Sequence, residues 1–261
     1  MAEASDTVRL ALDAGVATIT LNRPEQLNSL TPEMLLEIPR VLDRAVDAGA
    51  RAILITGAGR AFCAGAALGS GATPGVTDLG ESIATYYNPL AEALSAAPVP
   101  IVSAINGPAA GAGASIALGA DVIVAAESAY LLLAFANIGL VPDAGATWLV
   151  AKSAGRVKAM EMALLGERMS AEEAHRFGLV TRVVADAELL TVATALARKL
   201  AEMPTQALGL IRRQVRSALD LSFEDSLALE RDNQRRAGFT DDYVEAVDAF
   251  KAKRRPVFKG H

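Results

Sequence analysis

The sequence is poor in the residues that build disulfides and metal sites. It contains a single cysteine, Cys63, and two histidines among its 261 residues. One cysteine cannot form an internal disulfide, and a metal site built from several thiolates is excluded as well. Two histidines are also too few for a histidine-rich metal centre. Carboxylates, hydroxyls and backbone groups are left as candidates for the chemistry of this chain.

Positive charge is scarce too. The formal net charge is −5, so we expect neither nucleic acid nor an anionic membrane surface to be the main partner. No uncharged apolar run reaches the roughly 18 residues that a membrane span needs, and the polar, acidic residues 1–6 do not resemble a signal peptide. Because hydrophobic residues make up 52% of the chain, the sequence predicts a globular, cytoplasmic protein with a sizeable core.

Residues 101–120 are the most informative stretch and read I-V-S-A-I-N-G-P-A-A-G-A-G-A-S-I-A-L-G-A. An apolar run over 101–105 predicts a buried strand, Asn106-Gly107-Pro108 ends it, and residues 114–118 favour a helix. The loop between them is all alanine and glycine, so another molecule can approach the backbone, and the helix start offers unpaired N–H groups to a negative charge. Tight packing of the helix on the strand explains the same small residues equally well.

A second small-residue loop follows the strand expected at 51–56, and it reads G-A-G-R-A-F-C-A-G-A-A-L-G over 57–69. Each of the two loops can present a backbone N–H. Two convergent N–H groups form an oxyanion hole, which stabilises the charge that develops on a thioester oxygen when an enolate forms. The pair of loops therefore indicates a site for a developing anion.

Charged residues almost vanish over 99–151, where there is no lysine or arginine and the only acids are Asp121, Glu127 and Asp143. So few charges indicate a buried core. Asp143 lies between a proline turn and a helix that we expect to start there and run to about residue 153. It either caps that helix or, with apolar neighbours and no basic neighbour, serves as a proton carrier.

Strands and helices alternate up to about residue 185, and helices dominate after it. The pattern predicts a hairpin over 8–21 and parallel pairing of its second strand with 51–56. Pro39 and Pro89 should kink or break the helices that contain them. A capping box is expected at Ser170 and Glu173. We expect helices over 31–49, 78–97, 186–202, 204–220, 222–237 and 240–253, and further strands over 121–125, 130–135 and 179–184. The fold class is therefore α/β.

Four motifs together resemble the crotonase (enoyl-CoA hydratase/isomerase) superfamily: F-C-A-G-A-A-L at 62–68, N-G-P-A-A-G-A-G-A-S-I-A at 106–117, L-N-R-P at 21–24 and I-G-L-V-P-D-A-G at 138–145. The resemblance extends from about residue 8 to 260. It implies a crotonase-like ββα spiral core over 1–200 and a C-terminal α-helical trimerisation region over 201–261. It also implies an acyl-CoA thioester substrate, a homotrimer or homohexamer, and no metal or redox cofactor.

By position in these motifs, the resemblance assigns the oxyanion-hole N–H groups to Ala66 and Ala112. It implies that the loop 23–27 and the segment 64–68 hold the CoA, and that the basic segment 253–259 reaches the CoA phosphates of its own or a neighbouring subunit. Trp148 or Phe135 could line an acyl pocket. The residues expected to contact substrate or CoA are Arg23, Glu25, Leu27, Ala64, Gly65, Ala67, Leu68, Gly111, Phe135 and Lys259.

The chain departs from the hydratases of this family at their two glutamates, whose positions are held by Ser115 and Phe135. These two side chains cannot both activate water and protonate carbon. Ala67 likewise stands where an aspartate is usual. Asp143 matches the aspartate that does the chemistry in isomerase branches, and the segment 109–121 most resembles the branch of 1,2-epoxyphenylacetyl-CoA isomerases. One carboxylate suits an isomerase that moves a proton along a bound thioester.

Other functions stay open as alternatives. One is an enoyl-CoA hydratase, and another is a catalytically silent acyl-CoA-binding protein that keeps only the oxyanion loops. A serine hydrolase built on Ser115 is disfavoured because the full G-x-S-x-G turn is absent. NAD binding is disfavoured since Ile116 replaces the third glycine of a dinucleotide loop. We expect Cys63 to be a small buried thiol.

Overall fold

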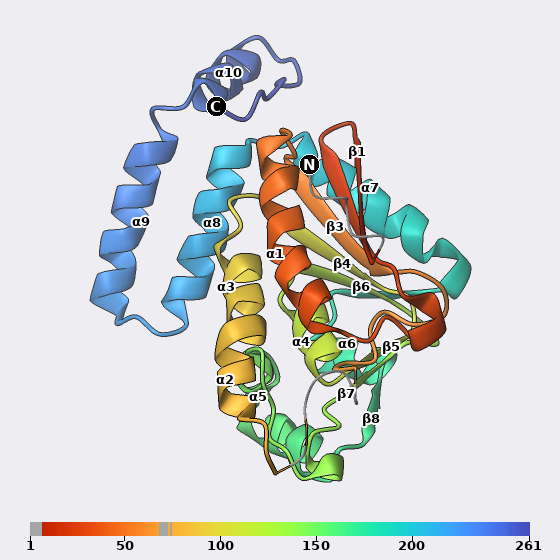
Figure 1. Ribbon diagram of the computed structural model, residues 1–261. Coiled ribbons are helices and arrows are strands. Elements are labelled where there is room, and N and C mark those ends of the chain that lie inside the picture. The colour runs from red at the N-terminus through yellow and green to blue at the C-terminus, as the bar shows by residue number, and fades with distance from the viewer. Residues whose placement is uncertain (1–6, 68–72, 74) are drawn as a thin grey trace.

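A central sheet organises the molecule (Figure 1). The computed structural model describes residues 7–67, 73 and 75–261. Within them the sheet has six strands in the order β1-β2-β3-β4-β6-β9. The strands are β1 Val8–Asp13, β2 Val16–Leu21, β3 Ala52–Gly57, β4 Ile101–Ile105, β6 Val122–Ala126 and β9 Arg182–Val184. The predicted hairpin is confirmed by antiparallel pairing of β1 with β2, and the predicted parallel pairing of β2 with β3 is confirmed as well.

Helices bury this sheet from both sides. Every residue of β3 and β4 is buried, as is usual for parallel strands that are covered on both faces. Helix α1, Pro32–Asp47, packs beside β1, and α7, Leu189–Ala201, packs across β2, β3, β4 and β6. Thr31 caps α1 by accepting a hydrogen bond from the N–H of Met34, and the helix continues unbroken through Pro39.

A second, smaller sheet follows the carboxyl end of β4. It consists of β5 Pro108–Ala110, β7 Tyr130–Leu132 and β8 Arg168–Ser170, in the order β5-β7-β8. The prediction of a loop over the first of these segments is wrong, because Pro108–Ala110 pairs in parallel with Tyr130–Leu132. The strand expected to reach Phe135 ends at Leu132, where its partners β5 and β8 end as well. After β5 the chain turns into helix α4, Ala112–Leu118. A 3-10 helix, Ala136–Ile138, follows β7 instead.

The helix expected to break near Pro89 consists of three pieces. They are α2, Leu79–Ser82, a π-helical turn, Ile83–Tyr87, and α3, Asn88–Ala96. Pro89 is the second residue of α3 and follows the π turn, whose last residue is Tyr87. The predicted break is thus a local widening of the helix, as expected where a proline lacks the N–H of a continuing helix.

Helix α5, Ala146–Leu165, begins three residues after Asp143 and extends well beyond residue 153. Its N-cap is Gly145, and no side chain caps it. The interpretation of Asp143 as a helix cap is therefore wrong. Gly155, with φ of 81°, interrupts the helix. The next helix, α6, Ala171–Arg176, is capped at Ser170, which accepts a hydrogen bond from the N–H of Glu173 as predicted. The other half of the predicted capping box differs, because the carboxylate of Glu173 accepts from Lys158.

The last three helices, α8 Thr205–Ala218, α9 Phe223–Ala237 and α10 Asp241–Lys251, stand to one side of the sheet (Figure 1). Arg212 of α8 donates hydrogen bonds to the carbonyl oxygens of Leu94 and Ala97, which fastens α8 to the end of α3. Ser222 and Thr240 cap α9 and α10 as predicted.

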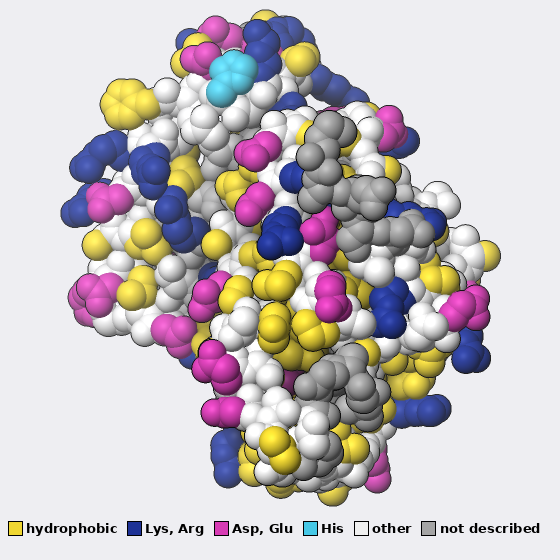
Figure 2. Space-filling model, viewed as in Figure 1, with side chains coloured by type: hydrophobic (Ala, Val, Ile, Leu, Met, Phe, Trp, Pro, Cys, Tyr) yellow, Lys and Arg dark blue, Asp and Glu magenta, His cyan; other side chains and the backbone are white. Residues whose placement is uncertain are grey.

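Large apolar side chains on these helices stay in contact with solvent. Figure 2 shows hydrophobic side chains interspersed with charged ones over this region. The most exposed are Phe223 at 72%, Phe239 at 85% and Phe250 at 84%. Among the described residues, no helix combines the length and the apolar character needed to cross a membrane.

Candidate active site

The two small-residue loops lie against each other. Cys63 donates its N–H to the carbonyl of Pro108, and Ala110 donates its N–H to the carbonyl of Cys63 at 2.9 Å. Gly65 has a φ of 89°, and a Cβ there would lie 2.8 Å from the carbonyl oxygen of Ala110. Only glycine permits both this backbone conformation and this approach. The two small-residue loops therefore pack against each other through their backbones.

The N–H groups of Ala66 and Ala112 are free to meet a ligand. Leu30 pairs with the residues on either side of Ala66, because its N–H donates to Gly65 and its carbonyl accepts from Ala67. In such a pairing the N–H of the residue between them points the other way. Ala112 is the first residue of α4, so its N–H has no carbonyl of the helix to donate to. Among the hydrogen bonds of the described residues, none uses either N–H.

Asp143 lies in the loop 139–145, which joins the 3-10 helix to α5. Its carboxylate oxygen Oδ1 is buried and has no hydrogen-bond partner in the described part of the chain. Burial raises the pKa of Asp143 to about 6, and a hydrogen bond from its own backbone offsets only part of that rise. A carboxyl group with this pKa can both take and return a proton near neutral pH.

Ser115 and Phe135, which occupy the glutamate positions of the hydratases, both lie next to these groups. The hydroxyl of Ser115 donates a hydrogen bond to the backbone carbonyl of Asp143 at 3.1 Å. The ring of Phe135 lies beside the small-residue loop that contains Gly111, since a Cβ on Gly111 would be 3.9 Å from its Cζ. Neither side chain can carry a proton as a glutamate does, so Asp143 is the carboxylate that the structure places here.

Tyr87 is a neighbour of Asp143 that the sequence analysis missed. It comes from the π-helical turn Ile83–Tyr87. Burial raises the pKa of its hydroxyl to about 12, and the nearby negative charge of Asp143 adds to the rise. The signal in the sequence was weak, because a tyrosine inside an expected helix reads as a core residue. Cys63 is buried as predicted, and burial raises its pKa to about 12, so it is a protonated thiol.

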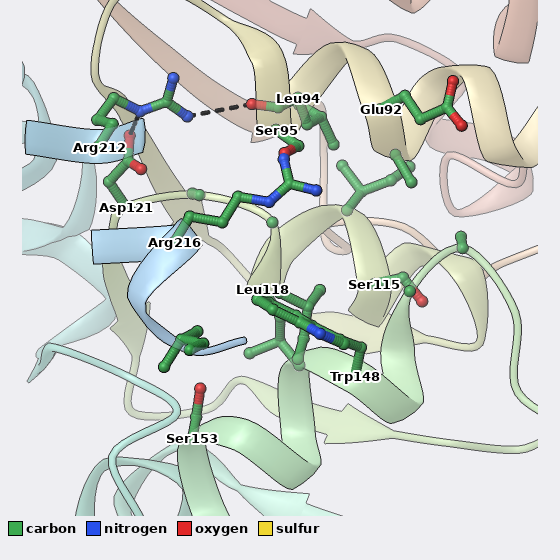
Figure 3. Close-up of a pocket in the computed structure, with 18 of the residues that line it drawn as sticks. Glu92, Leu94, Ser95, Ser115, Leu118, Asp121, Trp148, Ser153, Arg212 and Arg216 are labelled. Atoms are coloured by element: carbon green, nitrogen blue, oxygen red, sulfur yellow. Dashed lines mark hydrogen bonds and ion pairs between the residues drawn. The ribbon is translucent and has the colours of Figure 1, made fainter. Parts of the chain in front are cut away.

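A cavity of about 650 Å³ adjoins the site between α3, α4, α5 and α8 (Figure 3). Ser115 and Ala144 form part of its wall, next to Asp143. In Figure 3, Arg216 reaches into it from α8 toward Ser95, and Trp148 lies near Leu118. Large apolar lining residues include Leu90, Leu94, Ile116, Leu118, Trp148 and Leu149. Charged side chains also line the cavity, namely Arg212, Arg216, Glu92, Asp121 and Asp220. The cavity therefore offers a mostly apolar space with charges of both signs in its wall.

The loop 23–27 lies beside the small-residue loop that contains Ala64 and Gly65. Ala64 donates its N–H to the carbonyl of Leu27 at 2.9 Å. The buried side chain of Asn28, which the sequence analysis did not single out, donates to the carbonyls of Ala58 and Ala61. Its polar neighbours in N-R-P-E-Q-L-N gave no sign of burial. Glu25 is exposed, and Arg23 donates to the carbonyl of Ser29.

One of the predicted substrate-binding residues, Lys259, is not brought to this place. Lys259 lies near Arg51, which precedes β3 at its amino end, whereas the small-residue loops follow the carboxyl ends of β3 and β4. Within one protomer Lys259 is therefore at the opposite edge of the sheet, and contact with CoA held by its own subunit is not supported. Leu68 lies outside the described residues. Nowhere in the described ranges do three histidine, cysteine, aspartate or glutamate side chains gather as a metal site would need.

Comparison with known proteins agrees with this geometry. Residues 11–261 match the family described as Enoyl-CoA hydratase/isomerase. The 1,2-epoxyphenylacetyl-CoA isomerase of Escherichia coli (strain K12) is 48% identical over 95% of this chain and 97% of that protein. A Rhodobacter capsulatus protein named as a probable enoyl-CoA hydratase is 43% identical over 97% of this chain and 98% of its own length.

Solved structures give the same result for the fold. The crystal structure of enoyl-CoA hydratase from Bacillus anthracis is 32% identical and matches with a TM-score of 0.92, over 98% of this chain and 100% of that one. The crotonase-like α/β fold that the motifs implied is thereby confirmed. The chain belongs to the enoyl-CoA hydratase/isomerase family of enzymes.

Proposed function

We propose that this enzyme is an isomerase of acyl-CoA thioesters, acting on an enoyl-CoA or a ring-epoxide acyl-CoA. One observation carries the proposal. Beside the two small-residue loops, the described residues place one buried carboxylate, Asp143, with a pKa of about 6, while Ser115 and Phe135 stand at the positions of the hydratases' two glutamates. One such group suits the movement of a proton within a substrate, whereas hydration requires water to be activated and carbon to be protonated.

For an enoyl-CoA, the steps follow from the chemistry of these groups. The Asp143 carboxylate removes a proton from the carbon next to the thioester carbonyl, and the electron pair moves onto the thioester oxygen. The N–H groups of Ala66 and Ala112 stabilise the resulting enolate. The Asp143 carboxyl then returns the proton two carbons further along, and the double bond ends up next to the carbonyl. Protons and electrons balance within the substrate and one side chain, so no metal or redox cofactor is needed.

The cavity beside Ser115 supports a bulky acyl group. Its volume of about 650 Å³ exceeds what a four-carbon acyl chain needs, and pockets of this size take drug-sized ligands. The isomerase among the relatives is named for an epoxyphenylacetyl group, which is a bulky acyl group that contains a ring. We propose that the cavity receives the acyl part, while the loop 23–27 and residues 64–67 hold the CoA.

We also propose that the chain forms a homotrimer or homohexamer in the cytoplasm. The exposed Phe223, Phe239 and Phe250 are better placed against a neighbouring subunit than in water. In such an assembly Lys259 would contact the CoA of a neighbour and not that of its own subunit. A monodisperse monomer in light scattering at micromolar concentration would contradict the assembly.

The test of the reaction compares two assays on one enzyme preparation. We expect turnover of a 3-enoyl-CoA to its 2-enoyl isomer to exceed hydration of crotonyl-CoA by about a hundredfold or more, the effect of a positioned acid–base group. Hydration at a comparable rate would show that another group activates water. It would favour the second candidate, an enoyl-CoA hydratase, which the name of the Rhodobacter relative also suggests.

A further inference from the structure

The loop 139–145 has few bonds of its own to fix Asp143. It belongs to no strand or helix, and Ala144 and Gly145 both have positive φ, at 48° and 83°. Its backbone is tied at its two ends, where Leu140 donates to the carbonyl of Phe135 and Ala146 donates to the carbonyl of Asp143 at 3.0 Å. Neither bond connects the loop to α4, the helix that begins with Ala112.

Ser115 makes that connection. Its side chain is 2% exposed, and its hydroxyl donates to the carbonyl oxygen of Asp143 at 3.1 Å. Among the described residues, this is the only hydrogen bond from a side chain outside the loop that reaches the backbone of 139–145. Ser115 also lies one turn after Ala112 on the same short helix. A single hydroxyl thus links the helix that presents an oxyanion N–H to the loop that carries the carboxylate.

The direction of this hydrogen bond is informative. A serine inside a helix commonly donates to the carbonyl four residues earlier, which here is that of Gly111. Gly111 instead accepts backbone N–H groups from Ala114 and Ser115, and the hydroxyl leaves the helix to reach Asp143. A buried hydroxyl needs an acceptor, and the carbonyl of Asp143 supplies it. The bond thereby connects α4 to the loop 139–145.

We propose that Ser115 is a positioning residue that holds Asp143 at its working distance from the oxyanion hole. The inference rests on the proposed role of Asp143 and names the group that supports it. An error of about 1 Å in the placement of a reacting group can cost about a hundredfold in rate. Replacing a glutamate of the hydratases by this hydroxyl therefore removes one acid–base group and fastens the one that remains.

The test uses three variants. Ser115→Ala removes the hydroxyl. Ser115→Thr and Ser115→Val introduce side chains of the same shape, of which only threonine carries a hydroxyl. We expect Ser115→Ala to lower kcat for 3-enoyl-CoA isomerisation by about 10- to 100-fold with KM changed by less than about threefold, because the proposed CoA-binding loops are unchanged and the cavity wall loses only one hydroxyl oxygen. Ser115→Thr should keep a kcat at least about tenfold above that of Ser115→Val. The ratio of these two kcat values tests the role of the hydroxyl even if the added methyl group lowers kcat in both variants.

Thr56→Val is the matched control. The hydroxyl of Thr56 is also buried and also donates to a backbone carbonyl, that of Ala104, at 2.9 Å, but it does not contact the loop 139–145. We expect its kcat to stay near that of the unaltered enzyme. In Ser115→Ala the carboxyl should gain water, so the acid limb of the kcat profile should move to lower pH. Thr56→Val should not move it.

Two outcomes would overturn the proposal. One is a folded Ser115→Ala enzyme with unchanged kcat and unchanged acid limb. The other is equal loss in Ser115→Thr and Ser115→Val. Asp143→Asn separates this failure from that of the proposed function. If Asp143→Asn is inactive while Ser115→Ala is normal, only the role of Ser115 fails; if Asp143→Asn is fully active, the proposed function itself fails.

Discussion

The small-residue loops and the loop 139–145 are held in place by different means. In the loops around Gly65 and Gly111, backbone groups bond to backbone groups, and two N–H groups are left over. In the loop 139–145, the carbonyl of Asp143 accepts a backbone N–H from Ala146 and the hydroxyl of Ser115. Around Gly65 and Gly111 the first arrangement needs small residues, and the side chain of Asn28 holds only the start of the first of these loops, at Ala58 and Ala61. The second arrangement depends on the side chain of Ser115.

This difference predicts where the enzyme tolerates substitution. Ala66 and Ala112 act in our proposal through their N–H groups alone, so a change of side chain that preserves the backbone should matter little. Asp143 and Ser115 act through their side chains, so even nearly isosteric replacements should be costly. The predictions below probe these two regions in order of expected effect.

The largest effect is expected for Asp143→Asn. Removal of the proton carrier should lower isomerase turnover by about 10²- to 10⁴-fold, the usual contribution of a positioned acid–base group. Because Asp143 is not the N-cap of α5, no capping bond is lost, and the variant should melt at or above the temperature of the unaltered protein near pH 7. Steady-state kinetics and thermal melts measure both. A folded variant with near-normal turnover would remove Asp143 from the mechanism.

The next largest effect is expected for Ala112→Pro, which deletes one N–H. Proline is tolerated at the first position of a helix, and Ala112 is the first residue of α4, so the protein should fold. Loss of one oxyanion donor should lower kcat by about 10²- to 10³-fold. Ala112→Gly keeps the N–H and serves as the control, with a kcat close to that of the unaltered enzyme. Equal turnover in both variants would exclude this N–H from the mechanism.

A smaller, graded effect is expected from pH. The carboxylate must be ionised to remove a proton, and burial raises the pKa of Asp143 to about 6. Turnover should therefore be constant above that pH and fall about tenfold for each unit below it. The pH dependence of kcat in the range where the protein stays folded measures this limb. A midpoint near 4, the ordinary value of an aspartate, would show that the carboxyl is not enclosed when substrate is bound.

Much of the fold could be predicted from the sequence because its signals are local. Alternation gave the hairpin, and polar residues before apolar runs gave the caps at Thr31, Ser222 and Thr240. The errors lie where tertiary pairing decides. Pro108–Ala110 became a strand because Tyr130–Leu132 lies alongside it, and no local pattern encodes that partner.

The candidate site divides in the same way. The motif positions indicated Asp143 and the two small-residue loops, but the sequence could not show which role Asp143 has. The structure decides against the cap, because α5 starts at Ala146 with Gly145 before it. The sequence showed Ser115 only as a residue that stands where the hydratases have a glutamate. Its hydrogen bond to Asp143 joins residues 28 positions apart in the sequence. Contacts of this kind depend on the fold and have no signature in spacing.

The central claim is that Asp143 exchanges a proton with the carbon next to the thioester carbonyl. The most direct measurement is deuterium exchange from D₂O into a saturated acyl-CoA, followed by NMR, which reports proton removal without any later step. We predict exchange at the α-carbon with the unaltered enzyme at pH 7 and its loss in a folded Asp143→Asn variant that still binds the acyl-CoA. Exchange at equal rates in both proteins would contradict the account.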